Sequence, residues 1–217
     1  MLNFQAARQA MVDCQIRPAD VTRYALIDAM MKIPREQFVP KTRRDIAYVE
    51  MEVPVTSHRA LLAPRILAKM IEVSDLHADD LVLELCPGTG YSTAILASMT
   101  EVVVAVEPDE ALAEQAQTVL EGLGINNAIV TNGDPQMGDA SHGPFDLIFI
   151  NGAVEEVPAR LGDQLKEGGR IVALVQKGAT CACHSFTRAG GSLSGRYHFD
   201  GFGPLLDGFQ GTREFSF

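Results

Sequence analysis

From Leu81 onward, short apolar runs alternate with amphipathic helical segments, and this alternation restricts the possible folds more than any other feature. The runs are Leu81–Leu85, Val102–Val106, Ala128–Thr131, Phe145–Ile150 and Arg170–Val175. They are nearly continuous in apolar residues, as strands are when helices cover both faces of a parallel sheet. The β-α-β-α order predicts an α/β fold, with a doubly wound, mostly parallel, Rossmann-like sheet.

Clear boundary signals mark the helix between the second and third runs. Pro108-Asp109-Glu110 starts it with acids in the first turn, and Gly124 ends it. Its inner face carries Leu112, Ala116, Val119 and Leu123. We also expect Gly168-Gly169 to close the helix that precedes the fifth run.

The first 78 residues predict a helical extension packed on a core of residues 79–217, the whole forming a single compact domain. One helix carries Leu26, Ala29, Met30 and Ile33 on one face and ends at Pro34. Pro54 marks an extended stretch, and Pro64 begins a new helix with Leu67, Met70 and Ile71 inside. Near the other end, Phe215 and Phe217 suggest a closing strand, so we expect antiparallel C-terminal strands.

Composition excludes some classes of partner. The formal net charge is −10, and an acidic surface repels phosphate backbones, which argues against nucleic acid. No apolar run reaches the roughly 18 residues of a membrane span. The N-terminus lacks the pattern of a secretory signal, so we expect a cytoplasmic protein. The oligomeric state is left open.

Four cysteines are too few and too scattered for a disulfide scaffold. Cys181-x-Cys183-His184 could supply three zinc ligands, but a fourth ligand at a familiar spacing is missing and the surroundings are typical of a strand. We therefore expect reduced thiols and no metal.

The loop that leaves the first apolar run is the expected ligand site, because ligands of such sheets bind at the carboxyl ends of strands. It reads Glu84-Leu85-Cys86-Pro87-Gly88-Thr89-Gly90-Tyr91 and leads into a helix. Glu107 ends the second run, 17 residues past Gly90, where an acid can accept hydrogen bonds from both hydroxyls of a ribose.

Two cofactors suit this loop. A dinucleotide requires G-x-G-x-x-G, and Thr93 stands at the third glycine position, which disfavours a nicotinamide oxidoreductase. S-adenosylmethionine has no phosphate and is cationic at its amino group and sulfonium, so Glu84 suits it. The plain alternative is a tight turn with surface acids.

Beyond the loop, further segments resemble a known family. They are Ile33–Pro40, which contains P-R-E-x-F-V, then Val82–Glu84, Gly88–Leu96, Gly133-Asp134, Gly143–Ile148 and Gln164–Arg170. Over nearly its full length the chain resembles the protein-L-isoaspartate (D-aspartate) O-methyltransferase family. The resemblance implies a class I methyltransferase fold and the repair of damaged proteins, by methyl transfer from S-adenosylmethionine to the free carboxylate of isoaspartyl residues in peptides or proteins.

The resemblance also implies roles for individual residues. Glu84, Gly88 and Gly90 would hold the methionine end of the cofactor, Glu107 its ribose and Asp134 its adenine, while Asn151 would face the reaction cleft. The adjoining Cys86, Tyr91, Pro108 and Gly133 belong to the same expected cofactor site. A carboxylate acceptor, with an ordinary pKa near 4, is already ionised at neutral pH, so the reaction needs alignment rather than a general base.

Two departures from the family pattern concern the acceptor and the loop. The family's G-Q-T-I-S-x-P segment aligns with residues 58–64, so Leu62 stands at the active-site serine and Ala60 at the threonine. Cys86 replaces the first glycine of the loop, where a side chain hinders positive φ.

Arg59 is our candidate to replace the lost hydroxyls by binding the substrate carboxylate, because a guanidinium binds carboxylates through its fork. His58 is a candidate neighbour in the cleft. A surface role for both residues is the alternative. The altered segment also leaves open a small carboxylate, hydroxyl or thiol acceptor, and a non-catalytic cofactor-binding protein.

Overall fold

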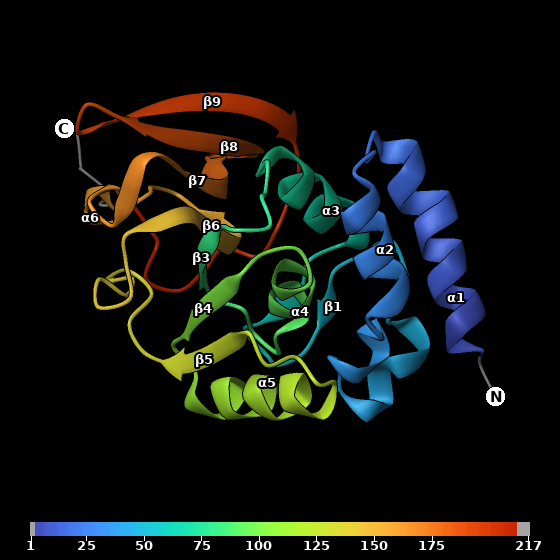
Figure 1. Ribbon diagram of the computed structural model, residues 1–217. Helices are drawn as coiled ribbons and strands as arrows, with labels where there is room; N and C mark the ends of the chain where they lie inside the picture. Colours follow the sequence, from blue (N-terminus) through green and yellow to red (C-terminus); the bar gives the residue numbers. More distant parts are fainter. Residues whose placement is uncertain (1–2, 212–217) are drawn as a thin grey trace.

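The apolar runs form neighbouring strands of one sheet in a computed structural model that describes residues 3–211 (Figure 1). The strands are β3 (Leu81–Leu85), β4 (Val102–Glu107), β5 (Ala128–Asn132), β6 (Phe145–Val154), β7 (Leu165–Lys177), β8 (Thr180–Ala189) and β9 (Ser192–Asp200). Within the described residues their order is β5-β4-β3-β6-β7-β8-β9. The pairs from β5 to β7 are parallel, and β7, β8 and β9 pair antiparallel.

The centre of the sheet is β3, which lies between β4 and β6. The chain moves outward to β4 and β5 and then returns to place β6 on the other side of β3. This reversal opens a crevice at the carboxyl ends of β3 and β6, and open α/β sheets bind ligands at such a point. The predicted α/β class and mostly parallel sheet are confirmed.

One face of the sheet carries most of the helices: α3 (Pro64–Val73), α4 (Tyr91–Ala97) and α5 (Glu110–Gly122). The other face packs against the short α6 (Ala159–Gly162) and apolar residues that follow β9. Asp109 caps α5 by accepting hydrogen bonds from two backbone N–H groups of its first turn, and Gly124 follows its end at a φ of 73°. These boundaries match the prediction.

The N-terminal segment contains α1 (Phe4–Met11), a π-helical turn (Val12–Ile16), the 3₁₀ turn Arg17–Ala19 and α2 (Tyr24–Lys32). Two further 3₁₀ turns follow, Arg35–Gln37 and Lys41–Ile46, and then the short hairpin of β1 (Val53–Pro54) and β2 (Ala60–Leu61). Residues 33–63 are therefore mostly not α-helical, whereas α2 stops before Pro34 and α3 starts at Pro64 as predicted.

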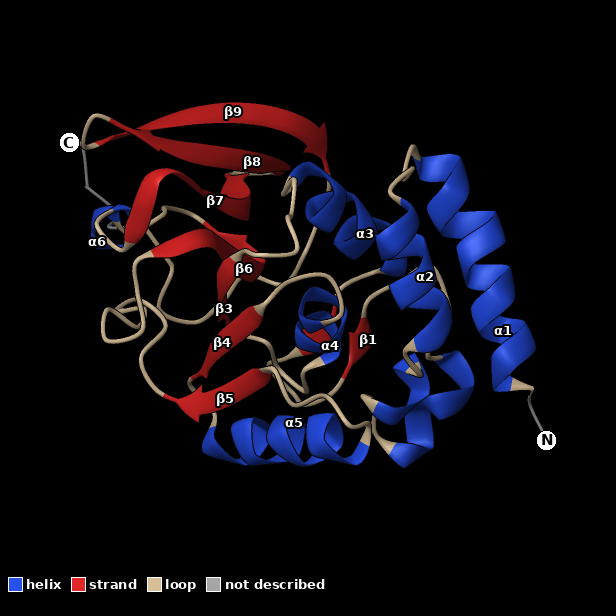
Figure 2. Cartoon of the chain, in the orientation of Figure 1, coloured by secondary structure: helices blue, strands red, loops and turns tan. Residues whose placement is uncertain are grey.

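Figure 2 shows the N-terminal helices gathered at one side of the molecule and the β8–β9 hairpin at the top. One apolar cluster contains buried residues from both parts, such as Met30 of α2 and Val103 of β4. The N-terminal segment thus shares its core with the sheet. No helix within residues 3–211 has the length and apolar content that crossing a membrane requires.

The prediction for Gly168-Gly169 is wrong, because both residues lie inside β7. The pairing of β6 with β7 shifts register between Phe145 and Leu147, and Gly168 has a φ of 78°. A Cβ on Gly169 would lie 2.9 Å from the carbonyl oxygens of Lys166 and Phe145. The glycines therefore permit a β-bulge rather than a helix end. The strand suggested by Phe215 and Phe217 lies outside the described residues.

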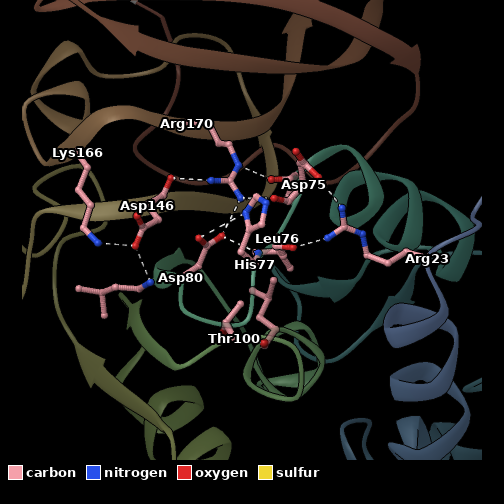
Figure 3. Close-up of polar contacts among 12 residues, drawn as sticks. Arg23, Asp75, Leu76, His77, Asp80, Thr100, Asp146, Lys166 and Arg170 are labelled. Atoms are coloured by element: carbon pink, nitrogen blue, oxygen red, sulfur yellow. Dashed lines mark hydrogen bonds and ion pairs between the residues drawn. The ribbon is translucent and has the colours of Figure 1, made fainter.

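A polar network holds the amino ends of the central strands together (Figure 3). Arg170 donates hydrogen bonds to the Asp80 carboxylate at 2.8 Å and to the carbonyl oxygens of Asp75 and Asp146 at 2.7 and 3.1 Å. The Asp146 carboxylate accepts from Lys166 Nζ at 2.7 Å and from Leu81 N at 2.8 Å. The amino ends of β3 and β6 and the start of β7 are thereby tied to one another.

Candidate active site

The loop after β3 has three residues in the left-handed region: Cys86 at φ 62°, Gly88 at 60° and Gly90 at 89°. The Cys86 N–H donates to the carbonyl oxygen of Val106 at 2.8 Å, which anchors this turn to β4. Cys86 therefore takes the conformation that its side chain opposes, at a cost of about 1 kcal/mol.

The two glycines of the loop serve different purposes. A Cβ on Gly90 would lie 3.2 Å from the Ala116 Cβ, so Gly90 lets the start of α4 approach α5 closely. A Cβ on Gly88 would meet no heavy atom within 4 Å. The backbone at Gly88 is accordingly open to a ligand.

Glu107, at the end of β4, joins the loop to the segment between β1 and β2. Its buried carboxylate accepts hydrogen bonds from Gly88 N at 2.8 Å and from Asp109 N at 3.3 Å. Arg59 Nη2 lies 2.8 Å from Oε1 and 2.7 Å from Oε2 of the same carboxylate. The structure therefore brings together Arg59 and Glu107, for which the sequence suggested separate ligands.

Glu84 begins a buried chain of polar side chains. Ser92 Oγ donates to Glu84 Oε1, and Asn151 Nδ2 donates to Ser92 Oγ at 2.8 Å. Burial raises the pKa of Glu84 to about 7. The Ser92 and Thr93 hydroxyls act in the opposite direction, and the nearby charge of Glu107 adds to the rise. Ser92 was not among the predicted site residues, although its place in the first turn after the loop is a usable signal.

Two acceptor atoms in the group formed by Glu84, Ser92 and Asn151 lack a hydrogen-bond partner. Within the described part of the molecule, Glu84 Oε2 and Asn151 Oδ1 are buried and receive no hydrogen bond. Buried polar atoms are normally satisfied, so a pair of unsatisfied acceptors beside an open glycine loop indicates a place for a donor. A ligand that carries an ammonium group fits this set of oxygens, and a phosphate does not.

A cleft of about 340 Å³ lies above Glu107. Its lining consists of Thr56, His58, Arg59, Glu107, Pro108, Asp109 and Asp207. Three acidic residues and a single arginine thus line the cleft, which favours a cationic ligand. The predicted His58, Arg59, Glu107 and Pro108 meet here, with His58 exposed on its loop.

Asp207 reaches the cleft from the far end of the chain, and sequence reasoning missed it. The segment around it runs beside the end of β6, where Ala153 N donates to Pro204 O at 2.9 Å and Leu206 N donates to Ala153 O at 2.8 Å. No local pattern marks Asp207, because only this long-range pairing brings it to the site.

The remaining predicted cofactor residues are distributed around the loop. Gly133 N donates to the Glu107 carbonyl at 3.1 Å, which places Asp134, exposed, next to the end of β4. The Tyr91 ring is buried and packs against Phe38 and under the Arg35 guanidinium, with the centroid 4.8 Å from Arg35 Cζ. The ring of Tyr91 therefore lies with the N-terminal segment rather than in the cleft.

Leu62, at the position of the family serine, belongs to the core. It is 2% exposed, and a Cβ added at Gly203 would lie 2.8 Å from its Cδ2 atom. Its carbonyl oxygen accepts a hydrogen bond at 2.7 Å from Arg35 Nη2, and Arg35 Nε donates to Ala47 O at 2.7 Å. Arg35 is fully buried and fixes the backbone that leads from the cleft to α3.

The cysteine group near the C-terminus lies in β8, which confirms the expected strand. Cys181 and Cys183 are buried in the main core cluster, whereas His184 points to the other face, near Phe186 and Tyr197. The three side chains therefore do not converge. Among residues 3–211, no group of three His, Cys, Asp or Glu side chains is arranged to hold a metal ion.

Comparisons with known proteins point to one family. A model of the family "Protein-L-isoaspartate(D-aspartate) O-methyltransferase (PCMT)" matches residues 6–200. A protein-L-isoaspartate O-methyltransferase of Syntrophus aciditrophicus is 37% identical over 172 residues, 79% of each chain, and one of Roseiflexus sp. is 35% identical over 214 residues, 98% of each chain.

A solved protein-L-isoaspartate O-methyltransferase has a TM-score of 0.82 and 26% identity to this chain. The match covers 93% of this chain and 66% of the solved one, which is the longer of the two. The family match spans most of the sequence and includes both the loop after β3 and Glu107. The chain therefore belongs to the protein-L-isoaspartate (D-aspartate) O-methyltransferase family.

Proposed function

We propose that this protein transfers the methyl group of S-adenosylmethionine to the free carboxylate of isoaspartyl residues in damaged proteins. The observation that carries the proposal is the pair of unsatisfied buried acceptors, Glu84 Oε2 and Asn151 Oδ1, beside the open loop of a member of this family. These oxygens suit the ammonium group of that cofactor.

The residues for holding the cofactor follow the carboxyl edge of the sheet. Glu84, Asn151 and the backbone at Gly88 and Gly90 would hold its methionine end. Cys86 shapes the turn, and the Tyr91 ring packs against Phe38 outside the cleft. Glu107 would accept hydrogen bonds from the ribose hydroxyls. Pro108, Gly133 and Asp134 border the end of β4 and would hold the adenine.

Arg59 and His58, in the same cleft, are our candidates for binding the acceptor. When bound, S-adenosylmethionine supplies a methyl group activated by the sulfonium. The acceptor carboxylate, with an ordinary pKa near 4, needs no base at neutral pH. Arg59 would bind this carboxylate with His58 beside it, and the walls of the cleft would align the acceptor oxygen with the methyl group.

Ala60 and Leu62 stand where the family has a threonine and a serine, so the acceptor must be held by other residues. Leu62 is packed against the core, so a hydroxyl at this position would not lie in the cleft as the backbone stands. The full-length relatives favour the isoaspartyl acceptor over a small-molecule acceptor or a non-catalytic protein. Arg59 is our candidate to replace the hydroxyls, because it is the one arginine or lysine among the residues that line the cleft.

The decisive experiment incubates the protein with methyl-labelled S-adenosylmethionine and an isoaspartyl peptide, beside the aspartyl twin. Base-labile label on the isoaspartyl peptide alone is the expected result. Glu107→Gln should reduce the label strongly, whereas Glu114→Gln, an exposed carboxylate on α5, serves as the matched control with unchanged activity. Cofactor binding without label on the isoaspartyl peptide would contradict the proposed acceptor.

Cytoplasmic location and the absence of nucleic-acid and membrane partners stay predictions from the sequence. Cell fractionation and a filter-binding assay with DNA and RNA check them.

A further inference from the structure

The contact between Arg59 and Glu107 has a geometry that matters for the cofactor. A single nitrogen, Nη2, lies within 2.8 Å of both carboxylate oxygens and thus occupies the position between them. The other contacts of this carboxylate come from the backbone N–H groups of Gly88 and Asp109. A ribose diol that binds both oxygens must approach through the position that Nη2 holds.

We propose that Arg59 and the ribose compete for the Glu107 carboxylate, so that cofactor binding releases Arg59 into the cleft and there creates the acceptor site. This inference rests on the proposed function, which assigns the ribose to Glu107. It adds an order: the cofactor binds first, and the acceptor carboxylate binds second.

The backbone around Arg59 allows its side chain to move while the loop stays in place. Val55 N and Thr56 N donate to Arg59 O at 2.8 and 3.1 Å, and Arg59 N donates to Thr56 Oγ1 at 3.1 Å. These bonds hold the main chain of the turn. Within residues 3–211 the guanidinium is held by the Glu107 carboxylate and by the Cys86 thiol, which is a much weaker acceptor, so losing Glu107 leaves it only loosely held.

The charge of the cleft explains why a released arginine is needed. Glu107, Asp109 and Asp207 line the cleft, and Arg59 is the one arginine or lysine among its lining residues. Three carboxylates repel an acceptor that is itself a carboxylate. While Arg59 is paired with Glu107, its charge is neutralised and the acceptor has no cation to bind.

Isothermal titration with S-adenosylhomocysteine tests the competition without any catalytic step. Arg59→Ala and the polar variant Arg59→Gln should both bind it about tenfold more tightly than the wild type, because no ion pair has to be broken; tenfold corresponds to about 1.4 kcal/mol. Arg65→Ala removes an exposed arginine that is paired with Glu50 outside the cleft, so its affinity should match the wild type. A thermal melt verifies that each variant is folded.

Titration with the isoaspartyl peptide tests the order. The wild type should bind the peptide at least tenfold more tightly when S-adenosylhomocysteine is saturating, and Arg59→Gln should lose this gain. Unchanged or weaker S-adenosylhomocysteine binding in both Arg59 variants would overturn the competition, as would equal peptide affinity with and without it. A wild type that binds no S-adenosylhomocysteine would instead overturn the proposed function.

Discussion

Replacing Glu84 with glutamine should make the ligand-free protein more stable and its cofactor binding weaker. The side chain is fully buried, and its pKa is about 7 in the folded protein against an ordinary value of 4.5. The folded state therefore holds the proton more tightly than the unfolded state. Stability falls as the pH rises from 4.5 to 7, and above pH 7 the full cost of burying the charge is present.

The size of this cost follows from the two pKa values. Each pKa unit corresponds to about 1.4 kcal/mol, so ionised Glu84 lowers the free energy of unfolding by about 3 kcal/mol at pH 8 and by less than about 1 kcal/mol at pH 5. Glutamine has the same shape, can accept the hydrogen bond from Ser92, and carries no charge. Glu84→Gln should recover about 3 kcal/mol at pH 8 and little at pH 5.

Urea unfolding followed by circular dichroism at pH 5 and pH 8 measures both differences, with exposed Glu114→Gln as the control. In the same variant, the affinity for S-adenosylhomocysteine at pH 8 should fall at least tenfold, because the neutral amide replaces the charge that faces the ammonium group. In the wild type this affinity should decline below pH 7, as Glu84 takes up its proton. A stability difference of the same size at both pH values, or a variant less stable than the wild type at pH 8, would refute the reasoning.

Other perturbations test the supports of the site. Arg35→Met should lower the free energy of unfolding by about 3 kcal/mol in a urea titration, because it leaves two buried carbonyl oxygens without a donor; a loss below about 1 kcal/mol would show that Arg35 is dispensable. Gly90→Ala should cost about 2 kcal/mol, measured in the same way, since it strains a φ of 89° and crowds Ala116; a neutral effect would contradict the close approach of α4 and α5. With a thiol reagent, exposed Cys14 should react at once and the three buried cysteines only after unfolding, since burial raises the pKa of Cys86 and Cys183 to about 12; fast reaction of a second thiol in the native protein would argue against their burial.

The features that the sequence predicted correctly are local ones. Strands β3 to β6 begin at the residues where the apolar runs begin, and the loop after β3 and the acid ending β4 follow from their positions relative to those runs. Proline and acidic residues located the starts of α3 and α5 in the same way. Such signals act within a few residues, so a single sequence contains them.

The features that were missed depend on contacts between distant segments. Arg35 is buried because Ala47 and Leu62 present carbonyl oxygens to it, and Asp207 joins the cleft because its segment pairs beside the end of β6. The glycine pair at 168–169 has a composition that suits either a helix end or a bulge, and only the pairing with β6 decides between them. The pairing of Arg59 with Glu107 likewise joins residues 48 positions apart.

The polar network at the amino ends of the strands makes one edge of the sheet differ from the other in how fully its polar groups are hydrogen-bonded. The Arg170 guanidinium donates to three different oxygens, whereas at the opposite edge Glu84 and Asn151 each have an oxygen that accepts no hydrogen bond within residues 3–211. Work to adapt the protein to heat or storage therefore has a natural target: substitutions near Lys166 and Asp75 can strengthen the fold far from the reaction. For the same reason, a surface tether or a reporter dye can be attached near the amino ends of the strands without obstructing the cleft.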